Sequence, residues 1–201
     1  EKLDRVRPEA QAALALLMRE DAASVFKQQS PSSKPYFATL LGLLTSSSLH
    51  PIVAKTATVD RESWISRLMA GFVTSADTGQ EELVITSRAA LTEYCEASPA
   101  NVDLVCNALV HNLKAHASED RVVVPTLEII AFLFHVGIFA RSTSVDMRKL
   151  CLQTQRVGYK TGNVRKITAC VKVYGGVAAL SSGEGSEEAR KRLGALMFHP
   201  W

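Results

Sequence analysis

The segment from Val145 to Lys166 is rich in positively charged side chains that could bind a partner. It holds one carboxylate, Asp146, and six cations: Arg148, Lys149, Arg156, Lys160, Arg165 and Lys166. The wider range 141–172 has eight cations and one acid, a balance of +7, whereas the remaining 15 cations and 19 acids sum to −4. Such a locally basic segment is either a solvated face or an electrostatic contact surface for an acidic partner.

Helical periodicity places these cations on the outside of two consecutive helices. At 100° per residue over 145–160, Lys149, Arg156 and Lys160 fall within about 40° of one another. The opposite side carries Met147, Leu150, Cys151, Thr154 and Val157. In the next helix, Arg165 and Lys172 point away from a predicted apolar stripe made of Val164, Ile167, Cys170, Val171, Tyr174 and Ala178. We therefore predict that Lys149, Arg156, Lys160, Arg165 and Lys172 bind a partner, with an ordinary solvated face as the alternative.

The same cations allow two further interpretations. The steps "VDMRK" and "NVRK" are similar to the Val-Arg step that opens the second helix of many HEAT repeats, where the arginine braces neighbouring helices. Arg148 and Arg165 therefore have a structural alternative. Nucleic acid is disfavoured, because only Tyr159 and Tyr174 interleave with the cations and the isoelectric point of about 8.7 is modest.

The residue types that carry catalysis or bind metals are not spaced for either role. The cysteines Cys95, Cys106, Cys151 and Cys170 form no C-x-x-C and lie in apolar-periodic segments, which indicates buried thiols in a reducing compartment. His111 and His116 are five residues apart, not the four that would put two zinc ligands on one helix face. No phosphate-binding loop motif occurs. We predict a binding module that has no catalytic residue, metal or cofactor.

The apolar period of the elements that would position these residues is helical almost throughout. A loop is predicted at 28–34, and helices at 8–27, 35–49, 60–76, 80–96, 101–117, 118–141, 144–159, 163–180 and from about 186 onward. Asp60 is a candidate N-cap. Starts about 20 residues apart give helix pairs of about 40, the period of HEAT and armadillo arrays. We predict an all-α, HEAT/armadillo-like α-solenoid of stacked antiparallel helix pairs over residues 1–201, with a compact helical bundle as the alternative.

One predicted helical segment is apolar enough to compare with a membrane span. Val122–Ala140 is 19 residues long, close to the roughly 20 that a span needs. It contains Pro125, Glu128 and His135, and ionisable side chains are unfavourable in lipid. We predict a helix buried by its neighbours and no membrane span.

The ends of the chain suggest that it is part of a longer array. The first residue is Glu1 rather than methionine, and the last, Trp201, directly follows His199-Pro200. Terminal repeats of natural arrays carry polar caps. We expect a C-terminal fragment of a larger HEAT-repeat protein, with an apolar patch at one or both ends.

Three stretches resemble the C-terminal region of the tubulin-folding cofactor D family: "MAGFVTSADTGQEELVITSRAAL" (69–91), "RKLCLQTQRVGYKTGNVRKITACVKVYGGVAAL" (148–180) and "EEARKRLGALMFHPW" (187–201). The resemblance runs from about Tyr36 onward and is strongest to fungal members. It implies a HEAT-repeat chaperone that binds β-tubulin and works with other tubulin cofactors and an Arf-like small GTPase to assemble or dissociate the αβ-tubulin heterodimer.

The same resemblance implies a cytoplasmic, cytoskeleton-associated protein without an active site of its own. No short catalytic motif defines the family, and any GTP hydrolysis that the assembly promotes would use tubulin's nucleotide site. Tubulin surfaces are acidic, which fits the basic segment. The alternative function is a generic HEAT scaffold for protein–protein interaction in another pathway, such as transport.

Overall fold

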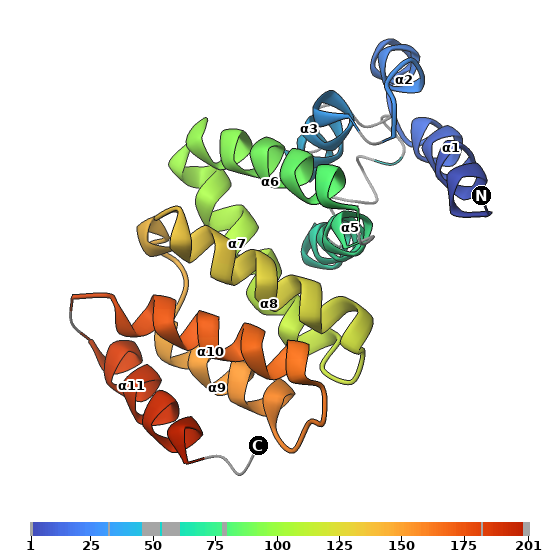
Figure 1. Ribbon diagram of the computed structural model, residues 1–201. Helices are drawn as coiled ribbons and strands as arrows, with labels where there is room; N and C mark the ends of the chain where they lie inside the picture. The colour runs from blue at the N-terminus through green and yellow to red at the C-terminus, as the bar shows by residue number, and fades with distance from the viewer. Residues whose placement is uncertain are drawn as a thin grey trace. The chain divides into compact units, whose positions relative to one another are not determined.

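The chain is α-helical, with no β-strand, over the residues that the computed structural model describes: 2–31, 33–45, 53, 61–77, 80–181 and 183–198 (Figure 1). Side chains are described from Pro8 onward. The contacts divide the chain into two compact units, Glu1–Tyr94 and Cys95–Trp201. The predicted all-α class is confirmed.

The first unit is organised around a row of aromatic side chains. The helices whose bounds are described in it are α1 (Lys2–Ala15), α2 (Glu20–Lys27), α3 (Lys34–Gly42), the 3₁₀ turn η1 (Leu43–Thr45), α5 (Arg61–Ala76) and most of α6 (Glu81–Glu96). Phe26 stacks on Tyr36 at 5.1 Å between ring centroids, and Phe37 contacts Tyr36 and Phe72 edge-on. These four rings are buried and tie α2, α3 and α5 together.

The predicted helix 8–27 is wrong, because the structure breaks it into α1 and α2. The turn tightens to i→i−3 hydrogen bonds at Leu16, Leu17 and Met18, which brings α2 back onto α1. The buried amide of Gln11 then donates to the carbonyls of Phe26 and Gln29, both at 2.6 Å. Gln11 thereby satisfies carbonyls at the end of α2, which a continuous helix could not present to it.

Two further predictions concern the first unit. The predicted loop at 28–34 matches the gap before α3, whose N-cap Ser33 accepts a hydrogen bond from the Tyr36 amide at 3.3 Å. The candidate N-cap Asp60 lies outside the described residues.

The second unit is a stack of helix pairs. It contains α7 (Pro99–Ala115), α8 (Asp120–His135), the 3₁₀ turn η2 (Phe139–Arg141), α9 (Met147–Gly158), α10 (Val164–Ala178) and α11 (Glu184–Met197). The first helix of one pair packs on the first helix of the next, α7 on α9, and the second helices pack likewise, α8 on α10 (Figure 1). The last helix, α11, packs on both α9 and α10. This is the packing of a HEAT-like α-solenoid, and the predicted fold class is confirmed.

Helix α8 is buried along much of its length and is shorter than predicted. Its residues 122–127 are all buried, as are Ile129, Ile130 and Leu133. It ends at His135 rather than at 141, because Gly137 takes φ +75° and the Ile138 amide bonds back to the Leu133 carbonyl. This glycine-terminated cap needs a left-handed residue. Within the described ranges, no helix combines the length and apolar character needed to cross a membrane.

Candidate functional site

Lys149 and Arg156, two of the predicted cations, are exposed on α9, and Lys149 lies in its first turn, just after the N-cap residue Asp146. The Asp146 carboxylate accepts a hydrogen bond from the Lys149 amide at 3.0 Å, and this bond lowers the pKa of Asp146. The Lys149 ammonium also lies 3.5 Å from Asp146, with 77% of its side chain exposed. Arg156 is exposed in the last turn. Because seven residues are close to two helical turns, Lys149 and Arg156 share one side of α9.

Lys160 does not lie on this helix, contrary to the prediction of a helix through residue 160. Helix α9 ends at Gly158, and Lys160 adopts a left-handed backbone with φ +50°. Its ammonium lies 5.3 Å from the centroid of the Tyr159 ring. The turn and this cation–π contact, rather than helical periodicity, therefore set its direction.

The arginines of the two Val-Arg-type steps bridge neighbouring helices. Arg165 on α10 grips Glu128 on α8 through two hydrogen bonds, Nε to Oε1 at 2.7 Å and Nη2 to Oε2 at 2.6 Å. Arg148 on α9 donates to Glu184 on α11 at 2.8 Å. The bracing alternative therefore describes the contacts of both arginines. Lys172, seven residues after Arg165, is exposed.

The predicted cations lie on two sides of the α9–α10 layer rather than on one surface. The two helices meet where the Cys170 thiol lies 3.7 Å from the Thr154 carbonyl oxygen. Lys149 and Arg156 point about 140–160° away from Thr154 around α9. Arg165 and Lys172 point about 140–160° away from Cys170 around α10. The α9 pair and the α10 pair therefore face opposite sides.

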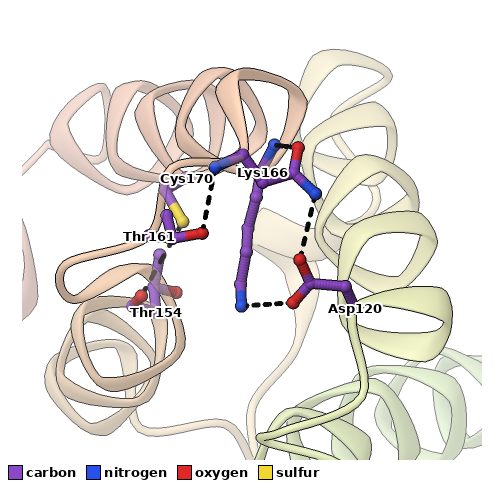
Figure 2. Close-up of polar contacts among 6 residues, drawn as sticks. Asp120, Thr154, Thr161, Lys166 and Cys170 are labelled. Carbon is purple, nitrogen blue, oxygen red and sulfur yellow. Dashed lines mark hydrogen bonds and ion pairs between the residues drawn. The ribbon is translucent and has the colours of Figure 1, made fainter.

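One cation of the basic segment, Lys166, is buried, and the sequence interpretation missed it. Only 7% of its side chain is exposed, and Nζ lies 2.6 Å from Asp120 Oδ1 at the start of α8. Figure 2 shows the lysine reaching from α10 to this carboxylate. Asn163, the N-cap of α10, donates to the other Asp120 oxygen at 3.0 Å and accepts from the Lys166 amide at 3.2 Å. The ion pair and the Asn163 bond lower the pKa of Asp120.

The buried face of α10 is rotated from the predicted apolar stripe. Val164 is 65% exposed and Val171 is 37% exposed. The buried residues are instead Lys166, Ala169, Cys170, Val173, Tyr174 and Val177. Their spacing of three and four residues marks one helix face, and Lys166 begins it.

Comparison with known proteins identifies the family to which this chain belongs. Residues 1–166 match the family model described as tubulin folding cofactor D C terminal. The chain belongs to this cofactor D C-terminal family. The match includes Lys149, Arg156, Lys160 and Arg165 but ends before Lys172, α11 and the resembling stretch 187–201. The comparisons with curated proteins and with solved structures found no significant match.

The cysteines of this cofactor D region are buried thiols, as predicted. Burial raises the pKa of Cys95 to about 12 and the pKa values of Cys151 and Cys170 to about 11. Burial also raises the pKa of Cys106. Since the thiolate is the reactive form, these side chains act as small apolar residues. Among the described residues, no three His, Cys, Asp or Glu side chains are grouped to hold a metal ion.

A carboxylate on α7 fixes the loop that leads into α9 of the cofactor D region. Asp103 accepts hydrogen bonds from the hydroxyls of Ser142 (2.7 Å) and Thr143 (2.8 Å) and from the amides of Thr143 (2.9 Å) and Ser144 (3.2 Å). The Ser142 hydroxyl is the largest cause of the lowered pKa of Asp103. These bonds hold the basic helix α9 at its start.

Replacing Asp103 with asparagine is expected to lower the free energy of unfolding by about 2 kcal/mol at neutral pH, because hydrogen bonds to a charged acceptor are lost. The folded pKa lies below the unfolded value of about 3.9, so the carboxylate stabilises the fold above that pH. The difference between wild type and variant should shrink as the pH falls below about 4. Urea unfolding of both proteins at pH 7 and pH 3 measures this difference in the free energy of unfolding. Glu187→Gln, at an exposed carboxylate, is the control and should change little.

Proposed function

We propose that this chain is a non-enzymatic tubulin chaperone segment that binds β-tubulin, a fellow tubulin cofactor, or both, during assembly and disassembly of the αβ-tubulin heterodimer. The observation that carries the proposal is the cofactor D C-terminal family match over residues 1–166. The stacked helix pairs support it, because such stacks present extended binding surfaces.

The cellular setting follows from the same family resemblance. The segment would work in the cytoplasm and associate with the cytoskeleton, and an Arf-like small GTPase would be a further partner. GTP hydrolysis promoted by the assembly would take place at tubulin's nucleotide site. Binding of purified αβ-tubulin to the 201-residue chain tests this function directly.

Within this function, the proposed contact surface is the α9 side of the second unit. Lys149 and Arg156 are exposed there, Lys160 is exposed in the turn that follows α9, and tubulin offers an acidic surface. Long-range attraction between the two would mainly speed association. Arg165 and Lys172 remain predicted contacts on the opposite side of the layer. Glu128 already holds the Arg165 guanidinium, which leaves Arg165 less available to a partner than Lys172.

Reversing the three α9-side charges together is expected to weaken tubulin binding by about 10-fold at low salt. Individual exposed ion pairs contribute only about 0–1 kcal/mol, so Lys149→Glu, Arg156→Glu and Lys160→Glu are combined. The effect should fade with salt, because the Debye length falls from about 10 Å at 0.1 M to about 3 Å at 1 M. Surface plasmon resonance at two salt concentrations measures both rate constants.

A matched control separates this surface from overall charge. Lys114→Glu, Arg121→Glu and Lys191→Glu change the net charge equally at exposed cations on α7, α8 and α11 rather than on α9 or the turn after it. The control variant should bind better than the α9 variant. The α9 variant should fold, since all three side chains are exposed and an acid at position 149 lies in a helix first turn, where the helix dipole favours it.

Two outcomes would count against the proposal at different levels. Equal binding by the two triple variants would show that the α9 cations form an ordinary solvated face, while the proposed chaperone function would still stand. If the folded wild-type chain bound neither tubulin nor a tubulin cofactor, the generic HEAT scaffold of another pathway would become the better description.

A further inference from the structure

A pocket of about 290 Å³ lies between the end of α9, the turn that follows it, α10 and the last turns of α11. Its apolar walls come from Ile167, Tyr174, Ala195 and Leu196, and Tyr159 stands beside it with two thirds of its surface exposed. Pockets that hold small ligands usually measure about 300–1,000 Å³. This one is at the lower limit of that range, so its size suits a single inserted side chain better than a cofactor.

The charged lining of this pocket is positive. Its lining residues include two cations, Lys160 and Arg192, and no carboxylate. Arg192 is held in place by Glu188 on the same helix, with Nε 2.7 Å from Oε1. That pairing offsets the charge of Arg192, so Lys160 is the cation that remains to attract an anion. An apolar pocket edged by a cation is complementary to an apolar side chain flanked by acids.

The backbone at Lys160 supports a role in binding rather than in folding. The residue has φ +50°, a conformation that glycine adopts without a steric penalty and other residues adopt at a cost of about 1–3 kcal/mol. The left-handed turn places its ammonium over the Tyr159 ring at the pocket. Backbone strain of this kind is concentrated at binding sites.

We propose that this pocket binds an acidic peptide segment of a partner protein, with one aromatic or large aliphatic side chain inserted among α9, α10 and α11 and its acidic neighbours beside Lys160. The two residues that follow the lining residue Leu196 in the chain are also apolar and exposed: Met197 by 82% and the C-cap residue Phe198 by 88%. The proposal does not require that the partner be tubulin, and peptide binding can therefore succeed or fail independently of tubulin binding.

The test uses the full chain and a fluorescein-labelled, glutamate-rich peptide with one central phenylalanine, followed by fluorescence anisotropy. Serine in place of the phenylalanine should weaken binding by about 10-fold or more, because the burial of one aromatic side chain is lost. A lysine-rich peptide with the same phenylalanine should bind more weakly than the glutamate-rich one. Equal affinity for the serine peptide, or for the lysine-rich peptide, would overturn the proposal.

Substitutions in the protein locate the binding site. Ala195→Trp, at an exposed position in the lining, should fill the pocket and lower the affinity for the peptide by about 10-fold or more. Ala115→Trp, at an exposed alanine on α7 outside the lining, should not. Unchanged binding by Ala195→Trp would overturn the proposal.

Lys160→Gly provides a second variant that does not depend on tolerance of a large side chain. It removes the cation and relieves the backbone, so its thermal midpoint should be unchanged or a few degrees higher while the peptide binds more weakly. Unchanged affinity for the peptide in this variant would contradict the role of Lys160.

Discussion

Replacing Gly185 with alanine is expected to lower the free energy of unfolding of the second unit by about 2–3 kcal/mol. Gly185 is buried in the first turn of α11. A Cβ there would lie 2.5 Å from the Met147 Cβ, 2.9 Å from the Met147 carbonyl carbon and 3.0 Å from the Arg148 amide nitrogen. Two of these atoms belong to the backbone of α9, so the clash can be relieved only if one helix moves. Denaturant unfolding followed by circular dichroism measures the loss.

The same helix supplies the control for this prediction. Gly194 is also in α11, and a Cβ there would have no neighbour within 4 Å. Gly194→Ala should raise the free energy of unfolding by about 0.5–1 kcal/mol, because alanine loses less backbone entropy in a helix than glycine does. Effects of the same sign and size in the two variants would contradict the close approach of α11 to α9.

Replacing Asp120 with alanine is expected to lower the free energy of unfolding by about 3 kcal/mol. The change removes the carboxylate that faces the buried ammonium of Lys166, and an unpaired buried charge costs about 3–5 kcal/mol. The lower end applies because 47% of the Asp120 side chain is exposed. Lys166→Met should cost less, since an apolar side chain of similar length replaces the charge. The double variant should resemble Lys166→Met rather than sum the two losses.

Two further measurements test whether the Asp120–Lys166 pair stabilises the fold because it is buried: a comparison with an exposed ion pair, and the pH dependence of stability. Glu128→Ala removes the carboxylate that faces Arg165, whose side chain is 51% exposed, and should lower the free energy of unfolding by about 1 kcal/mol or less. The pKa of Asp120 is lowered in the folded chain, so its carboxylate stabilises the fold above the unfolded value of about 3.9. This contribution should be lost as the pH falls below about 4. Equal losses in Glu128→Ala and Asp120→Ala would contradict the buried pair.

The helix starts could be predicted because the groups that set them lie within three residues of one another. Asp146 and Asn163 accept the amides of Lys149 and Lys166, three residues later, and Ser98 accepts the Ala100 amide. Caps of this kind combine with the apolar period to mark where these three helices begin. The repeat spacing, and with it the fold class, follows from those starts.

Features set by residues far apart in the chain could not be predicted in the same way. The break between α1 and α2 depends on Gln11, whose bonds reach carbonyls 15 and 18 residues away. Burial of Lys166 depends on Asp120, 46 residues earlier. A sequence signal for Lys166 did exist, since it begins the spacing of three and four residues that continues through Cys170 and Tyr174.

The candidate site also combines features set by nearby residues with features set by residues far apart in the chain. Lys149 and Arg156 are exposed as helical periodicity predicts, whereas Lys160 is positioned by a turn. Gly158 and the "TGN" that follows Lys160 are typical turn residues and could have indicated an earlier helix end. That the cations lie on two sides of the layer depends on which face of α9 meets α10, and this follows only from the packed pair.

The stacking of helices in the second unit also affects how this unit can fold while it is being synthesised on the ribosome. The α9–α10 pair packs on the α7–α8 pair, α11 packs on α9 and α10, and the Asp120–Lys166 bond joins residues 46 apart. Translation adds about 5–20 residues per second, so Lys166 is synthesised about 2–9 s after Asp120. Helix–coil relaxation takes about a microsecond or less, and α8 therefore has ample time to form before α10 leaves the exit tunnel. The unit can be built layer by layer during synthesis, with each finished pair serving as the template on which the next one docks.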